Sequence, residues 1–146
     1  VNDQQRLSML VSARWILVMV HFERELYNDP DRPDLNRLWW DLVEKYQLVR
    51  RPDGRDAPDW ATKIHLALAP VYYHNYLLGE LMASQLTEAM GYGATGPMIG
   101  DFLRRRIFDR GATLHWNELL REATGEPLSA RFFVDQFVGE SLAGGA

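Results

Sequence analysis

The sequence contains no cysteine and only four histidines among its 146 residues. Without cysteine, the chain forms no disulfide, no iron–sulfur cluster and no thiolate zinc site. None of the histidines begins a His-Glu-x-x-His motif, the helical spacing in which two imidazoles one turn apart hold zinc; they are His21, His65, His74 and His115. The sequence therefore carries no complete zinc motif of this type.

Long apolar runs and an excess of positive charge are also absent. The longest apolar run, residues 15–20, is far shorter than the ~20 residues that a membrane-spanning helix needs. The net charge of −4 disfavours non-specific binding to nucleic acid, which requires a basic surface. We therefore predict neither a membrane span nor a nucleic-acid partner.

The composition that remains, 47% hydrophobic and 25% charged, is typical of a globular protein. Apolar residues recur at three- and four-residue steps, which predicts an all-α fold of about six helices. Asp3 and Asp34 are expected to cap the first two helices, Pro70 to open the third, and residues 60–69 to be irregular or extended. The expected helices span about residues 3–26, 35–48, 70–90, 97–108, 114–124 and 130–142.

Two segments carry sequence features that are more specific than the periodicity of an amphipathic helix. Residues 35–47 combine a tryptophan doublet with a Lys-Tyr-Gln ending, and Lys63-Ile64-His65 is followed by Tyr73-His74-Asn75-Tyr76. Together they resemble the C-terminal part of the angiotensin-converting-enzyme-like peptidases, the M2 family of zinc peptidyl-dipeptidases. The later pairs Gly96-Pro97 and Thr124-Gly125 extend the likeness, which covers nearly the whole chain.

The resemblance implies that residues 1–146 form one helical segment, the C-terminal subdomain of a larger α-helical zinc metallopeptidase. In that family one zinc is bound by a His-Glu-x-x-His motif and a later glutamate. The His-Glu-x-x-His motif is missing from this sequence. We therefore expect zinc in the parent protein, held by an upstream catalytic half that partners this segment. The segment alone is expected to bind no metal and to be inactive. The resemblance also implies a periplasmic or secreted location and a peptide substrate.

The resemblance assigns four site residues. Lys63 would pair with the C-terminal carboxylate of the peptide, and His65 would donate to a peptide carbonyl; both would point to one face of an extended segment. Tyr73 would also bind the carboxylate, unless the register places Tyr72 there. Tyr76, one helical turn on, would be the catalytic donor to the oxyanion. Taken without the resemblance, the same residues are a surface lysine, a histidine at the edge of the core and core tyrosines.

Chloride binding is doubtful. Many animal members of the family bind chloride through an arginine at the position of Asn75, and through another at the position of Val43. Neither residue here carries a charge.

Three other functions stay open. One is a helical oligopeptidase of the thimet type, and another is a non-catalytic helical binding domain derived from a peptidase. The third is a free-standing small all-α domain. The first is distinguished by products of variable length, and the second by an upstream sequence without His-Glu-x-x-His. An excised segment would expose apolar surface, so self-association is expected for it, whereas a free-standing domain would be monomeric.

Overall fold

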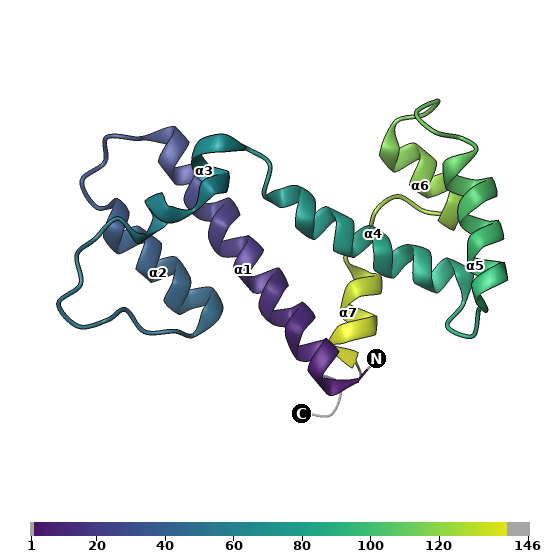
Figure 1. Ribbon diagram of the computed structural model, residues 1–146, viewed down its shortest axis with the longest axis horizontal. Helices are drawn as coiled ribbons and strands as arrows, with labels where there is room; N and C mark the ends of the chain where they lie inside the picture. Colours follow the sequence, from purple (N-terminus) through teal and green to yellow (C-terminus); the bar gives the residue numbers. More distant parts are fainter. Residues whose placement is uncertain (1, 140–146) are drawn as a thin grey trace. The chain divides into compact units, whose positions relative to one another are not determined.

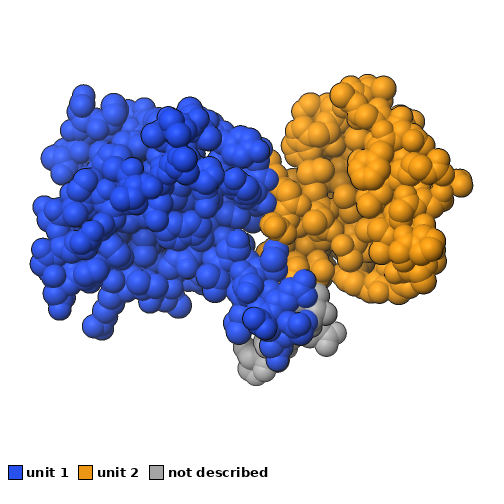
Figure 2. Space-filling model, in the orientation of Figure 1, with its two compact units in different colours: residues 1–77 blue, residues 78–146 orange. Residues whose placement is uncertain are grey.

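The computed structural model describes residues 2–139, which contain seven α-helices, a 3-10 helix, a π-helical turn and no strand (Figure 1). The predicted all-α class is therefore confirmed. The chain divides into two compact units, residues 1–77 and 78–146, coloured separately in Figure 2. All four predicted site residues belong to the first unit.

The first unit is built on two helices that pack side by side, α1 (Asp3–Asn28) and α2 (Leu35–Gln47) (Figure 1). A 3-10 helix (Asp59–Thr62) and the short α3 (Ile64–Leu68) follow, and α4 (His74–Met90) begins in this unit. The ring of Phe22 meets that of Trp39 edge to face at 5.2 Å, a favoured aromatic geometry. The buried core consists of Val18, Met19, Phe22, Leu35, Trp39, Val43 and Leu66.

The two predicted N-caps turn out differently. Asn2, not Asp3, caps α1, because its Oδ1 accepts the amide of Gln5 at 2.8 Å. Asp34 does occupy the N-cap position of α2, but its side chain accepts no hydrogen bond from the helix backbone. Both of its oxygens are instead taken by guanidinium groups, those of Arg32 at 2.7 Å and Arg37 at 2.8 Å.

The ion pairs of Asp34 predict a measurable pH dependence. The hydrogen bond from Arg32 is the main cause that lowers the pKa of Asp34 from 3.8 to about 2. A carboxyl whose pKa falls on folding stabilises the protein above its unfolded pKa, and this contribution is lost as the pH drops from 3.8 towards 2. Asp34→Asn should therefore lower the melting temperature at pH 6, and the difference from wild type should shrink by pH 3.

The matched control is Asp31→Asn, because Asp31 is exposed and forms no ion pair among residues 2–139. Its melting temperature should follow that of the wild type at both pH values. A deficit of Asp34→Asn that is the same at pH 6 and pH 3 would contradict the proposed linkage.

The segment 60–69 was predicted wrongly as irregular or extended. The 3-10 helix Asp59–Thr62 and α3 occupy most of it. Elements of four and five residues are too short to display a helical period in the sequence, which is why the pattern failed there. The third predicted helix also begins later than expected, at His74 rather than at Pro70.

The second unit contains the rest of α4, then α5 (Gly96–Leu103), the π-helical turn Arg104–Phe108, α6 (Trp116–Thr124) and α7 (Arg131–Phe137). The helix predicted to begin at about residue 114 begins at Trp116, with His115 at its N-cap position. The last helix was predicted to reach residue 142. It ends at Phe137 in the structure, and residues 140–142 lie outside the described residues. The buried apolar residues are Leu120, Phe132, Phe133 and Phe137.

A buried amide holds the second unit together. Gln85 on α4 is completely buried, and its Nε2 donates to Thr124 Oγ1 at 2.8 Å and to the Glu126 carbonyl at 2.9 Å. The same nitrogen lies 3.2 Å from the Pro127 carbonyl, and its Oε1 accepts the amide of Ser129 at 3.0 Å. One side chain thereby satisfies the backbone of the connection between α6 and α7, as burial of polar groups requires.

Candidate functional site

Three of the four predicted site residues meet in one aromatic cluster. His65 Nε2 lies 3.2 Å from the phenol oxygen of Tyr76, a hydrogen bond whose direction depends on the imidazole tautomer. The ring of Tyr73 meets the imidazole edge to face at 4.8 Å and the ring of Tyr76 at 5.1 Å. The cluster joins α3 to the start of α4, although its members are up to eleven residues apart in sequence.

The cluster is open to solvent on its Tyr76 side. Tyr76 is 46% exposed, whereas His65 and Tyr73 are half-buried. Tyr72 is 49% exposed, and its ring contacts that of Tyr76 at 5.8 Å. Tyr73, rather than Tyr72, is the tyrosine whose ring packs edge to face against the imidazole.

Trp15 connects the fourth residue, Lys63, to this cluster. The indole Nε1 of Trp15 donates to the Tyr73 hydroxyl at 3.1 Å, and the Lys63 ammonium lies 5.2 Å from the centre of the same indole. A second indole, that of Trp39, is 5.9 Å from the ammonium, within the range of cation–π attraction. Sequence reasoning missed Trp15, because it begins the apolar run of α1 and resembles an ordinary core residue there.

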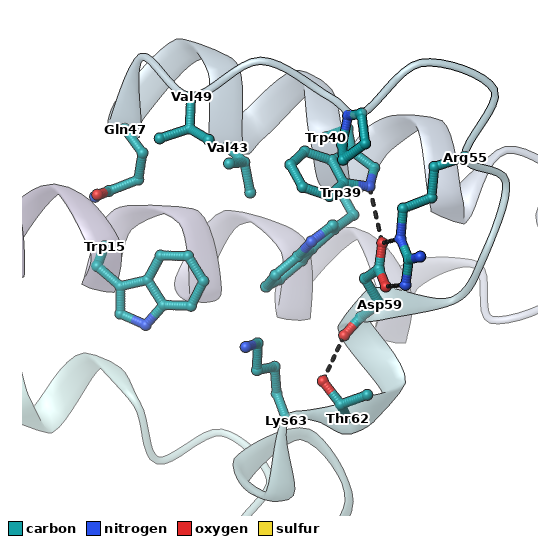
Figure 3. A pocket seen from close by; sticks show the side chains of 11 residues that line it. Trp15, Trp39, Trp40, Val43, Gln47, Val49, Arg55, Asp59, Thr62 and Lys63 are labelled. Atoms are coloured by element: carbon teal, nitrogen blue, oxygen red, sulfur yellow. Dashed lines mark hydrogen bonds and ion pairs between the residues drawn. The ribbon is translucent and has the colours of Figure 1, made fainter.

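The local structure of Lys63 and His65 differs from the prediction. Lys63 has extended backbone angles but is the N-cap of α3, and His65 is the second residue of that helix. The two residues therefore do not share one face of an extended segment, as was predicted, because His65 lies within the helix. In Figure 3 the Lys63 ammonium points towards the space between Trp15 and Trp39.

A buried carboxylate on α1 fixes the loop that carries Tyr73. Glu23 is 6% exposed, and its Oε1 accepts the amide of Val71 at 2.5 Å. Val71 has φ 55°, in the left-handed region that a β-branched residue seldom adopts. Tyr27, one turn after Glu23, donates its hydroxyl to the Leu66 carbonyl at 2.9 Å. Helix α1 thus holds both α3 and the loop before α4.

The environment of Glu23 also affects a neighbouring phenol. Burial is the largest cause that raises the pKa of Tyr27, and the nearby Glu23 carboxylate raises it further. Both effects favour the protonated phenol, which is the form that donates to the Leu66 carbonyl.

Lys63 forms part of a pocket of about 490 Å3 in the first unit (Figure 3). The indoles of Trp15, Trp39 and Trp40 line it, together with Val43, Val49 and Pro52. At one side Arg55 Nε donates to Asp59 Oδ2 at 2.7 Å, and Trp40 Nε1 donates to the same oxygen at 3.1 Å. The hydrogen bond from Arg55 is the main cause that lowers the pKa of Asp59, so this carboxylate stays ionised.

The described residues contain neither a candidate metal-binding cluster nor a candidate membrane span. Within 2–139, no three side chains of the His, Asp or Glu type gather closely enough to hold a metal ion. Among these residues no helix combines the length and apolar character of a membrane span.

Comparison with known proteins identified no relative of this chain. A scan against protein-family models, a search of curated proteins and a search of solved structures found no match to this chain.

Proposed function

We propose that this chain is the substrate-binding and transition-state-stabilising C-terminal portion of a zinc metallopeptidase that releases dipeptides from peptide C-termini. One observation carries the proposal. Lys63, His65, Tyr73 and Tyr76 lie in a single connected group, joined through the indole of Trp15. A lysine, an imidazole and two phenols supply one positive charge and several neutral donors, which suits a peptide end with its carboxylate and carbonyl groups.

Each side chain has a distinct role in this proposal. The Lys63 ammonium pairs with the terminal carboxylate, and Tyr73 adds a phenol donor to it. His65 donates to a peptide carbonyl. Tyr76 is close enough to His65 for the two to point at neighbouring atoms of one bound peptide. Its phenol donates to the oxygen on which negative charge develops, where a preorganised donor contributes most.

The remaining catalytic parts lie outside this set of residues. In the proposal, zinc and the general-base glutamate would belong to another part of the enzyme, where bound zinc would supply the activation of a water molecule. Val43 and Asn75 carry no charge at the two positions where the resembled family binds chloride, so the proposal includes no chloride.

The role of Lys63 is tested with the intact parent enzyme and two peptides that differ only at the C-terminus, one with a free carboxylate and one amidated. Wild type is expected to prefer the free carboxylate. Lys63→Met should lower kcat/KM for this peptide by about 10- to 100-fold, the size of a hydrogen bond to a charged group, and leave the amidated peptide unaffected. The preference is measured as the ratio of the two kcat/KM values.

The matched control is Lys45→Met, which removes the other lysine of the chain, an exposed residue on α2. It should keep the wild-type preference. If Lys63→Met also keeps it, Lys63 does not bind the carboxylate. The products separate the enzyme classes, since fragments of variable length would indicate an oligopeptidase of the thimet type. A parent protein without peptidase activity would indicate a binding domain.

A further inference from the structure

The tryptophan pocket has the size and the walls of a small-molecule site. We use this name for the 490 Å3 pocket lined by Trp15, Trp39, Trp40, Val43, Val49 and Lys63. Ligand pockets commonly span about 300–1,000 Å3 and combine apolar walls with a few placed polar groups. Trp39 is only 2% exposed and Val43 only 5%, so these two walls of the pocket are part of the buried core.

The charges around the pocket leave one cation unmatched. Arg55 and Asp59 neutralise each other through two hydrogen bonds, and Trp40 also donates to Asp59. Lys63 is half-buried between two indoles, and no carboxylate of the described residues lies within ion-pair distance of it, although the Asp59 carboxylate interacts with it electrostatically at longer range. Two positive groups and one negative group line the pocket, which leaves a single positive charge at Lys63.

We propose that the tryptophan pocket binds a small aromatic monocarboxylate. The carboxylate pairs with the Lys63 ammonium, and the aromatic ring lies against the indoles of Trp15 and Trp40. A neutral ligand would bury the ammonium without a partner, which is costly, whereas a single negative charge balances it. A flat ring matches the indole faces better than a branched aliphatic group, because offset and edge-to-face contacts favour aromatic pairs.

This inference goes beyond the proposed peptidase function. Its ligand is not a peptide and needs no zinc, no His65 and no Tyr76. Because both ligands use Lys63, an aromatic carboxylate in the pocket would exclude the C-terminus of a peptide from the ammonium. The pocket would then act as a site of competitive inhibition by small aromatic acids.

The test measures binding of indole-3-propionate and of its neutral amide to the full chain by isothermal titration calorimetry. The anion is expected to bind at least about tenfold more tightly than the amide, since one hydrogen bond to a charged group has this effect. Lys63→Met should remove the preference, and Lys45→Met should keep it. Lys63→Arg, which retains the charge, should keep part of it.

A second variant tests whether the ligand occupies the pocket, without changing the charge of the protein. Val49 is 52% exposed and lines the pocket, so Val49→Trp fills the cavity without disturbing the core. It should weaken binding of the anion by at least about tenfold, the loss expected when a bulky ring occupies the apolar site. If circular dichroism shows that Lys63→Met is unfolded, Val49→Trp and Lys63→Arg decide the question.

Three results would overturn the proposal: equal binding of the anion and the amide, an undiminished preference in a folded Lys63→Met, or unchanged affinity in Val49→Trp. Tyr76→Phe separates it from the proposed function, because Tyr76 does not line the pocket. This variant should bind indole-3-propionate as wild type does, whatever its effect on peptide hydrolysis.

Discussion

Tyr76→Phe in the intact parent enzyme is expected to lower kcat by about 10²–10³, the loss observed when one oxyanion donor is removed. The substitution deletes only the phenol oxygen that lies 3.2 Å from His65 Nε2. The ring stays and keeps its contacts with Tyr72 and Tyr73, so the aromatic cluster should hold its shape. The donor acts on charge that exists only in the transition state, so kcat and kcat/KM should fall together while KM changes little.

Tyr72→Phe is the matched control for this measurement. Tyr72 is a neighbouring, similarly exposed tyrosine, and its ring also contacts Tyr76. It should retain kcat within a few-fold of wild type. An unchanged kcat in Tyr76→Phe would remove Tyr76 from the mechanism. A large loss in Tyr72→Phe alone would instead place the catalytic phenol at Tyr72.

Gln85→Met is expected to destabilise the second unit by about 3 kcal/mol, because the Gln85 amide makes several hydrogen bonds to the part-buried connection between α6 and α7. Methionine has a similar length but cannot donate to Thr124 or to the Glu126 carbonyl, nor accept from the Ser129 amide. Gln85 is 0% exposed, so its own side chain is not hydrated in the folded state. Urea denaturation followed by circular dichroism measures the loss.

Gln47→Met serves as the control for Gln85→Met. Gln47 forms a single, exposed hydrogen bond to the Val11 carbonyl, so its loss should cost well under the effect at Gln85. Hydrogen exchange adds a local measurement, since the amide of Ser129 should exchange much faster in Gln85→Met. Equal denaturation midpoints for the two variants would show that the connection between α6 and α7 does not depend on this amide.

Periodicity predicted the long helices well, and for a physical reason. Helix α1 has 26 residues and α2 has 13, so each repeats its apolar face over several turns. One of the errors lies where a long-range contact decides the local structure. The third helix begins at His74 rather than Pro70, and the amide of Val71 bonds instead to Glu23, 48 residues earlier. Spacing in the sequence carries no information about such a contact.

The candidate site was also only partly predictable from the sequence. The residues Lys63, His65, Tyr73 and Tyr76 could be proposed from a resemblance between short motifs, without any view of their geometry. The meeting of His65 with both tyrosines, and the indole of Trp15 that links them to Lys63, are visible only in the folded chain. An apolar run predicts that a tryptophan is buried, but it does not show which group accepts the hydrogen bond of the indole Nε1.

The left-handed backbone of Val71 affects the stability of the protein and the conformational freedom of the segment before Tyr73 in opposite directions. A β-branched residue at φ 55° raises the energy of the native state by an amount on the order of 1–3 kcal/mol. Glycine would relieve this strain, but it would also allow many other conformations in the segment that leads to Tyr73. Selection for a more durable protein would favour glycine there, and selection for a sharply defined site would favour valine.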